Sequence, residues 1–204
     1  MNRIIYWIKA VRLRTLFLAF SCVYIGGSIA FLEKGFKFKI FLSALITALL
    51  LQILSNFAND LGDYLKGIDN VIRSGPPRTL QSGLITKKQM ICAIIINSIL
   101  CSISGLILIF ISLDKSNPAI FVFFICGICA VLAAVKYTMG RTPYGYAGLG
   151  DLAVFIFFGL IGVLGTLYLQ IHAIKLIYLL QAVSTGLLIT GVLNINNIRD
   201  IESD

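Results

Sequence analysis

Charged residues are scarce in this sequence. Only 13% of its 204 residues are Asp, Glu, Lys or Arg, against roughly 25% in an ordinary soluble domain. At the same time 58% of the residues are hydrophobic. This composition excludes a soluble globular domain, and we expect most of the chain to lie in a lipid bilayer.

The residues that build zinc sites and catalytic triads are also scarce. His172 is the single histidine, and it falls away from the acidic residues, so neither kind of site is expected there. All five cysteines lie in apolar runs, where a reduced thiol behaves as a small hydrophobe. Cys126 and Cys129 form a CxxC, but without a second pair or a flanking histidine it does not indicate a metal or redox site. The phosphate-binding pattern GxxxxGK[ST] is absent as well.

Six long apolar runs make up most of the chain. They cover about residues 15–32, 40–57, 90–113, 119–135, 152–169 and 174–194. About 20 helical residues cross about 30 Å of hydrocarbon, and the runs lack the two-residue alternation of a membrane β-barrel. We therefore predict an all-α, multi-pass transmembrane helical bundle. Residues 1–14 mix basic and apolar side chains and predict an interfacial amphipathic helix.

Basic residues are divided unevenly between the two sides of this bundle. Most Lys and Arg fall in residues 1–14, in the loops at 61–89 and 136–151, and at the end of the chain, all on one side. The positive-inside rule makes that side cytoplasmic. We therefore predict a protein of the cell (inner) membrane with a cytoplasmic N-terminus, and we attribute its net charge of +8 to topology and not to nucleic acid. Most carboxylates share this side, which favours a cation site there.

The string NFANDLGDYLKGIDN at residues 56–70 is the strongest chemical signal. Its oxygen-bearing side chains at Asn56, Asn59, Asp60 and Asp63 share one face of a helix. Carboxylates within one helical turn repel each other, and near hydrocarbon their charge costs several kcal/mol more. A bound divalent cation removes that cost, and such ligands suit Mg²⁺ completed by substrate phosphate oxygens.

A second face of this kind stands at the end of the chain. Asn196, Asp200 and Asp204 recur every four residues in NINNIRDIESD. Two such faces on one side of a bundle could clamp a diphosphate through Mg²⁺. The alternative, a solvated helix end, explains one motif more easily than two.

The loops on the same side carry further candidates. Arg78 lies in the helix-breaking string RSGPPRTLQSGLITKKQ, and Arg141 lies in KYTMGRTPYGYAGLGD. Arginine suits bidentate phosphate contact, although both loops could be basic only because they are cytoplasmic. Tyr144 and Tyr146 could contact an aromatic substrate or sit in the interfacial belt.

With these motifs the sequence resembles the UbiA-type intramembrane aromatic prenyltransferases. The resemblance rests on NFANDLGDYLKGIDN, GPPRTLQSGLIT, PYGYAGLGDLAVFIFFGLIGVLGTLYLQ and NNIRDIESD, and it covers essentially the whole chain. Within the family the sequence is most similar to the branch that prenylates 1,4-dihydroxy-2-naphthoate in menaquinone biosynthesis. The resemblance implies an all-helical bundle with a central cavity open to the cytoplasmic side, two Asp-rich motifs that bind Mg²⁺ and diphosphate, and a lipid-facing route for the polyprenyl tail.

The resemblance also implies roles for single residues. The implied Mg²⁺ ligands are Asn59, Asp60, Asp63, Asp200 and Asp204, with Asn56, Asn196 and Asp69 as further candidates. Asp63 and Asp200 are expected to be catalytic, and Lys66, Arg78 and Arg141 to bind the diphosphate. The last acid of the family's first motif is replaced here by Gly67, and Asp69 follows two residues later, as in the naphthoate branch.

The implied function is Mg²⁺-dependent transfer of a polyprenyl group from polyprenyl diphosphate to 1,4-dihydroxy-2-naphthoate, with decarboxylation, giving demethylmenaquinone. One alternative is another aromatic acceptor, of the 4-hydroxybenzoate or haem type. An alternative of a different class is a cation-coupled membrane transporter or an inactive membrane fragment. The family usually has about nine transmembrane helices and this chain has six apolar runs, so we expect a single UbiA-like domain over residues 1–204 that is truncated at its C-terminus.

Overall fold

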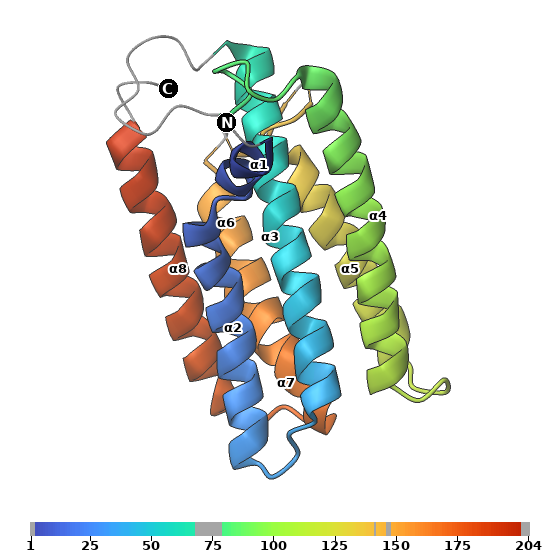
Figure 1. The fold of residues 1–204 in the computed structure, drawn as a ribbon. Coiled ribbons are helices and arrows are strands. Elements are labelled where there is room, and N and C mark those ends of the chain that lie inside the picture. The colour runs from blue at the N-terminus through green and yellow to red at the C-terminus, as the bar shows by residue number, and fades with distance from the viewer. Residues whose placement is uncertain (1–2, 68–78, 141, 146–147, 201–204) are drawn as a thin grey trace.

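The computed structural model describes residues 3–67, 79–140, 142–145 and 148–200. Within these ranges the ordered elements are all helices, and six segments are long and apolar enough to cross a membrane. Figure 1 shows them side by side in one elongated bundle. The predicted all-α, multi-pass architecture is thus confirmed.

Nine helical elements follow one another along the described chain. They are α1 (Arg3–Val11), α2 (Leu13–Leu32), α3 (Phe38–Lys66), α4 (Lys87–Ser112), α5 (Ala119–Lys136), α6 (Gly150–Val154), the π-helical segment η1 (Phe155–Gly165), α7 (Thr166–Ile171) and α8 (Tyr178–Asp200). α6, η1 and α7 are continuous and together form the fifth membrane-crossing segment.

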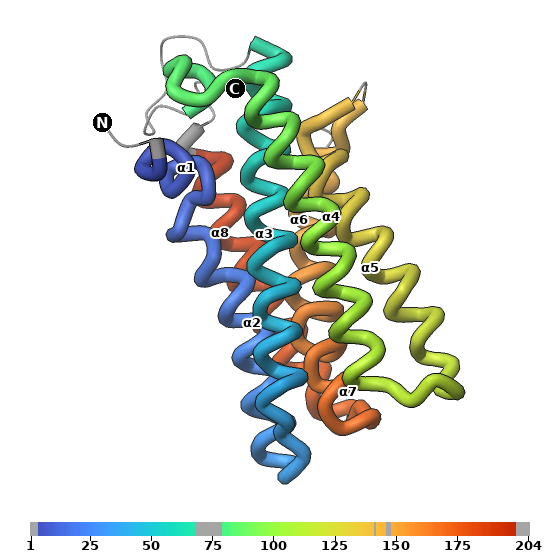
Figure 2. Tube along the Cα trace, turned by 45° about the vertical axis from the view of Figure 1, so that its right-hand side comes forward, coloured from blue at the N-terminus to red at the C-terminus, as the bar shows by residue number. Residues whose placement is uncertain are grey.

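α3 is the longest helix and packs against α2, α4 and α5 (Figures 1 and 2). It ends at Gly67, whose φ of 67° is a left-handed conformation that glycine adopts without strain. The second apolar run ends near residue 57, but the helix continues for nine more residues because no proline interrupts it before Gly67. The polar residues that follow the run are therefore part of the same rigid helix.

The two ends of the bundle differ in what they carry. α1, the last turns of α3 and the last turns of α8 lie together at one end, which we call the acidic end (Figure 1). The short connections after α2, α4 and α7 lie at the other, which we call the opposite end. At the acidic end the described part of the α3–α4 loop packs onto the bundle, since Leu80 and Ile85 are buried. A capping box between Thr86 and Gln89 then starts α4.

Large apolar side chains cover the outside of the bundle. Phe17, Leu32 and Leu188 are each more than 70% exposed, at 72%, 78% and 74%, and α5 has no buried residue. A soluble protein rarely exposes apolar patches of this extent, whereas in lipid they carry no hydration cost. The surface is that of an integral membrane protein.

Small residues bring the helices together inside the bundle. A Cβ atom on Gly159 of η1 would lie 2.7 Å from the Cα of Gly186 and 2.8 Å from the carbonyl oxygen of Ala182, both on α8. Membrane helices commonly approach through small residues in this way. The contact fixes α8 against η1 and so positions the helix that carries the second acidic motif.

Candidate active site

The first acidic motif occupies the last turns of α3. Asn56, Asp60 and Asp63 are buried, with 2%, 2% and 6% of their surface exposed, and Asn59 is half-buried. Two carboxylates three residues apart on one helix repel each other, and burial strengthens that repulsion. The site is therefore stable only if positive charge or hydrogen-bond donors surround it.

Arg12 supplies positive charge at Asp60. Its guanidinium forms an ion pair with Oδ1 of Asp60, and the hydroxyl of Thr79 donates a hydrogen bond to Oδ2 at 3.4 Å. Arg12 is the residue between α1 and α2, and its φ of 54° is left-handed. That conformation costs a residue other than glycine about 1 kcal/mol. The ion pair with a buried carboxylate offsets this strain.

Asn56 holds the α1–α2 junction against α3. Its Nδ2 donates to the carbonyl oxygen of Val11 at 2.7 Å and lies 2.9 Å from Oγ1 of Thr15. Its Oδ1 accepts a hydrogen bond from Nε2 of Gln52 at 3.2 Å. These bonds engage both amide hydrogens, so the structure gives Asn56 a positioning role beside Arg12, and its role as a further Mg²⁺ ligand stays a prediction.

Asn59 meets a different neighbour. The hydroxyl of Thr138, just after α5, lies 3.0 Å from the carbonyl oxygen of Ala58 and 3.2 Å from Oδ1 of Asn59. Gly62 allows this approach, because a Cβ atom there would lie 2.6 Å from the Thr138 side chain. The polar residues predicted to share one face of α3 therefore contact two different neighbours. Asn56 and Asp60 contact the α1–α2 junction, and Asn59 contacts the segment after α5.

Tyr144 connects the loop that follows α5 back to the end of that helix. Its hydroxyl donates to the carbonyl oxygen of Ala133 at 2.8 Å, and its ring packs edge-on against Tyr137 with 5.4 Å between centroids. Burial, and then the neighbouring Tyr137, raise the pKa of Tyr144 to about 12. The phenol therefore stays protonated and keeps donating to this carbonyl near neutral pH. Contact between Tyr144 and an aromatic acceptor stays a prediction.

The second motif is described only in part. Asn196 is half-buried on α8, whose last residue is Asp200, and Lys66 is exposed at the end of α3. Asn194 donates to Oδ2 of Asp151 at 3.1 Å, which ties the last turns of α8 to α6. The side chain of Asp200 and the residues Asp69, Arg78, Arg141, Tyr146 and Asp204 lie outside the described part of the chain.

The donor chemistry at the end of α3 fits a hard divalent cation. Asn59, Asp60 and Asp63 offer oxygen atoms within about one helical turn, which is the kind of ligand that Mg²⁺ prefers. Among the described residues, no three His, Cys, Asp or Glu side chains form a group that could hold a metal ion. A complete coordination shell therefore requires ligands from a second segment, from substrate or from water.

Three residues at this site were not singled out from the sequence. Arg12 belongs to the charge asymmetry that predicts the topology, and Thr79 and Thr138 are uncharged residues of loops, outside the acidic motifs. No spacing rule links them to Asp60 or Asn59, since 48 residues separate Arg12 from Asp60 and 79 separate Thr138 from Asn59. The one available signal for Arg12 was the cost of a buried carboxylate, which requires a cation from somewhere in the fold.

Comparison with known proteins places these observations in a family. Residues 19–204 match the UbiA prenyltransferase family. The chain is 47% identical to the 1,4-dihydroxy-2-naphthoate octaprenyltransferase of Escherichia coli K12, over 97% of this chain and 64% of that protein. It is 40% identical to the protein of the same name from Mycobacterium tuberculosis, over 97% of this chain and 65% of the relative. It is 30% identical to UbiA prenyltransferase domain-containing protein 1 of Dictyostelium discoideum, over 97% of this chain and 59% of that relative.

These alignments cover nearly all of this chain but not all of the relatives. The chain spans about 64% of the length of the Escherichia coli protein and about 65% of that of the mycobacterial one. No solved structure gives a significant match. The family match includes both acidic motifs and, apart from the first residues of α2, all six membrane-crossing segments. The resemblance inferred from the motifs is therefore confirmed, and this chain belongs to the UbiA prenyltransferase family.

Proposed function

We propose that this chain transfers a polyprenyl group from polyprenyl diphosphate to 1,4-dihydroxy-2-naphthoate, with loss of diphosphate and CO₂. The product is the hydroquinone demethylmenaquinol, which becomes demethylmenaquinone when a separate oxidant removes two electrons and two protons. The observation that carries the proposal is the pair of buried carboxylates, Asp60 and Asp63, at the end of a membrane helix beside Arg12. The acceptor is supported by relatives at 40–47% identity whose names specify 1,4-dihydroxy-2-naphthoate.

The donor site would combine both acidic motifs. Mg²⁺ would be held by Asn59, Asp60, Asp63, Asp200 and Asp204. A divalent cation bound there neutralises the charge of the leaving diphosphate. Lys66, Arg78 and Arg141 would bind the remaining diphosphate oxygens through charge-assisted hydrogen bonds, while Arg12 would stay paired with Asp60. The strict requirement for this arrangement is that α3 and α8 end on the same side, as they do in Figure 1.

The reaction follows from the chemistry of the two substrates. The allylic C–O bond breaks and its electron pair leaves with the diphosphate, while the electron-rich ring carbon forms the new C–C bond. The carboxyl group leaves as CO₂ with its bonding pair retained by the ring, and the proton released from the attacked carbon takes its place. The apolar bundle keeps water away from the allylic cation, which water would otherwise trap.

The activity test uses membranes that contain the chain, a labelled polyprenyl diphosphate and three acceptors in parallel: 1,4-dihydroxy-2-naphthoate, 4-hydroxybenzoate and haem. We expect labelled product and CO₂ only with the naphthoate, and loss of product when EDTA removes divalent metal. Asp63→Asn should lower the rate by about 100-fold or more, the usual loss when a group that stabilises leaving-group charge is removed. Asp114→Asn, an exposed carboxylate at the opposite end, is the matched control and should leave the rate unchanged.

Three outcomes would overturn the proposal. A near-normal rate in Asp63→Asn would remove the first motif from the site. Product with 4-hydroxybenzoate or haem but not with the naphthoate would replace the acceptor. Metal-dependent uptake into proteoliposomes without any product would favour the cation-coupled transporter.

The proposed topology places the acidic end and the N-terminus on the cytoplasmic side of the cell (inner) membrane, with the cavity open to that side. Lys88 lies at the start of α4 at the acidic end, and Lys115 lies in the α4–α5 connection at the opposite end. Lys88→Cys and Lys115→Cys can be labelled in intact cells with a membrane-impermeant thiol reagent. We expect labelling of the second variant alone, above the background of the parent protein, and the reverse result would invert the topology.

A further inference from the structure

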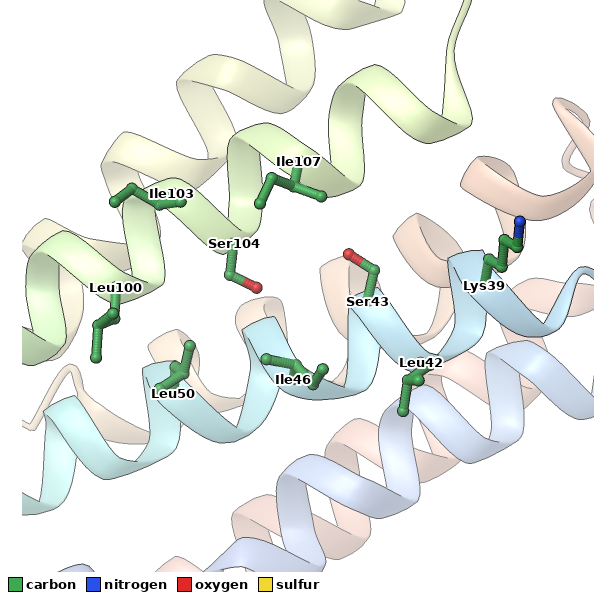
Figure 3. A pocket seen from close by; sticks show the side chains of 9 residues that line it. All are labelled: Lys39, Leu42, Ser43, Ile46, Leu50, Leu100, Ile103, Ser104 and Ile107. Carbon is green, nitrogen blue, oxygen red and sulfur yellow. The ribbon is translucent and has the colours of Figure 1, made fainter.

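A groove runs along the outside of the bundle between α3 and α4. It encloses about 430 Å³ and lies toward the opposite end, away from the acidic motifs. Figure 3 shows the side chains that line it. They are Lys39, Leu42, Ser43, Ile46 and Leu50 from α3, and Leu100, Ile103, Ser104 and Ile107 from α4. The proposed transferase activity uses none of them.

Small residues and one hydrogen bond account for the shape of the groove. The hydroxyls of Thr47 on α3 and Ser104 on α4 are 2.7 Å apart and hold the two helices at a fixed distance. Thr47 also donates to the carbonyl oxygen of Ser43 at 2.9 Å, so Ser104 is the donor between the two hydroxyls. Apart from Lys39, Ser43 and Ser104, the lining is leucine and isoleucine, which suits a hydrocarbon chain.

The groove has a positive charge at one end only. Lys39 is exposed in the first turn of α3, and Figure 3 shows it beyond the apolar side chains of its helix. The first turn contains no acidic residue, and Lys37 at the N-cap provides no side-chain cap. A helix N-terminus already carries positive partial charge, and the ammonium group of Lys39 adds a full positive charge at the end of the groove, so an anion bound there would be stabilised. None of the described residues that line the groove is acidic.

The length of the groove matches one leaflet of a bilayer. From Lys39 to Leu50 the helix rises by roughly 16 Å at about 1.5 Å per residue. Half of a hydrocarbon core of about 30 Å is about 15 Å. A chain that starts at the interface beside Lys39 would therefore reach the bilayer midplane at Leu50 and Leu100.

We propose that this groove is a binding site for an anionic glycerophospholipid, with one acyl chain between α3 and α4 and the phosphate at Lys39. The apolar lining selects a hydrocarbon chain, the length selects one that ends at the midplane, and the lysine selects a negative headgroup at the interface. The site is separate from the proposed donor site and does not depend on the transferase activity.

The test is native mass spectrometry of the purified full chain after partial delipidation and re-addition of equal amounts of phosphatidylglycerol and phosphatidylcholine. We expect one retained phosphatidylglycerol. Lys39→Gln should lower its retention about fivefold, the contribution expected of one lysine near an anionic lipid. Lys37→Gln is the matched control. It removes the same charge two residues before Lys39, and the side chain of Lys37 does not line the groove.

A second pair of variants tests the acyl chain separately from the headgroup. Ser43→Leu fills the groove and should lower retention of the lipid, whereas Ser102→Leu adds the same volume to an exposed position of α4 outside the groove and should not. Thermal unfolding of each variant checks that it is folded. Equal losses in Lys39→Gln and Lys37→Gln would overturn the proposal. Unchanged retention in Ser43→Leu, or equal retention of phosphatidylcholine, would overturn it as well.

Discussion

Among the described residues, an ion pair joins distant parts of the chain at each end of the bundle, and these two pairs differ in burial. At the acidic end Arg12 meets Asp60, with side-chain exposures of 28% and 3%. At the opposite end Lys175 meets Glu33 at 2.7 Å, with exposures of 59% and 31%. An exposed pair contributes little to stability, while a buried carboxylate that loses its partner is strongly destabilising. The acidic end therefore depends on each of its polar contacts, and the opposite end does not.

The difference in burial between the two ion pairs corresponds to different roles of the two ends of the bundle. At the opposite end Lys175 and the hydroxyl of Tyr178 both donate to Glu33, which fastens the end of α2 to the start of α8. Water can replace any of these bonds. At the acidic end the partners of Asp60 and Asn56 come from α1, α2 and the α3–α4 loop, so the same contacts that satisfy the charge also bring together the proposed donor site.

The largest expected effect on stability is that of Arg12→Ala. It removes the guanidinium that pairs with the buried carboxylate of Asp60, and we expect a loss of about 3 kcal/mol in the free energy of unfolding in mixed micelles. Arg14→Ala removes an exposed arginine two residues away and should change the same quantity by less than about 0.5 kcal/mol. Equal losses in the two variants would remove the contrast between buried and exposed charge.

The next effect concerns the close packing of α3 against the segment after α5. Gly62→Ala would place a Cβ atom 2.6 Å from the Thr138 side chain and 2.7 Å from its carbonyl oxygen. Because backbone cannot move aside as a flexible side chain can, we expect a loss of about 1–3 kcal/mol. Gly127→Ala on α5 meets nothing within 4 Å and should be neutral or stabilise by up to about 1 kcal/mol. A neutral Gly62→Ala would show that this contact is looser than the structure has it.

A smaller effect is expected for the hydrogen bond that reaches Asn59. Thr138→Val keeps the shape of the side chain and removes the hydroxyl that lies beside Ala58 and Asn59, which should cost about 1 kcal/mol. Thr138→Ser restores the hydroxyl and should recover most of that loss. If both variants are equally destabilised, the methyl group and not the hydroxyl holds the segment.

The smallest effect is expected at the opposite end, and it depends on pH. The hydrogen bond from Lys175, and then that from Tyr178, lower the pKa of Glu33 below its ordinary value of 4.5. The stability that this carboxylate contributes is therefore complete above the unfolded pKa and is lost as the pH falls through the lower native pKa. Lys175→Gln should lower the Tm slightly at neutral pH, and the difference from the parent protein should shrink below about pH 4. A difference that persists in acid would mean that the charge of Glu33 is not involved.

Much of the fold was predictable because hydrocarbon imposes simple rules. A membrane-crossing segment must satisfy its own backbone, so long apolar runs are helices wherever they occur, and all six are. The end of α3 was harder, because hydropathy marks where a segment leaves the hydrocarbon and not where its helix ends. Gly67 ends the helix through its backbone conformation, ten residues beyond the apolar run.

The sequence predicts a chemistry for the candidate site, but it does not predict the contacts that the site makes. Acidic residues at helical spacing predict a cation site, because the repulsion between their carboxylates has to be compensated. The residues at positions 56 to 63 are enough for this prediction. That Asn59 contacts Thr138 while Asn56 contacts Val11 and Thr15 depends on which helices pack around α3. Helical spacing fixes the direction in which each side chain leaves the helix axis, but it does not determine which segment of the protein packs on that side.

The sequence by itself determined that this chain is an all-helical membrane protein of the UbiA prenyltransferase family with acidic motifs near the ends of its second and sixth spans, and we propose that these motifs bind a cation. Only the tertiary structure decided that a left-handed arginine between α1 and α2 meets Asp60, and that α3 and α4 leave a groove ending at Lys39. The physical reason is that composition and periodicity act locally, through the solvation of each segment. Partners separated by tens of residues are chosen by helix packing, which the local pattern does not record.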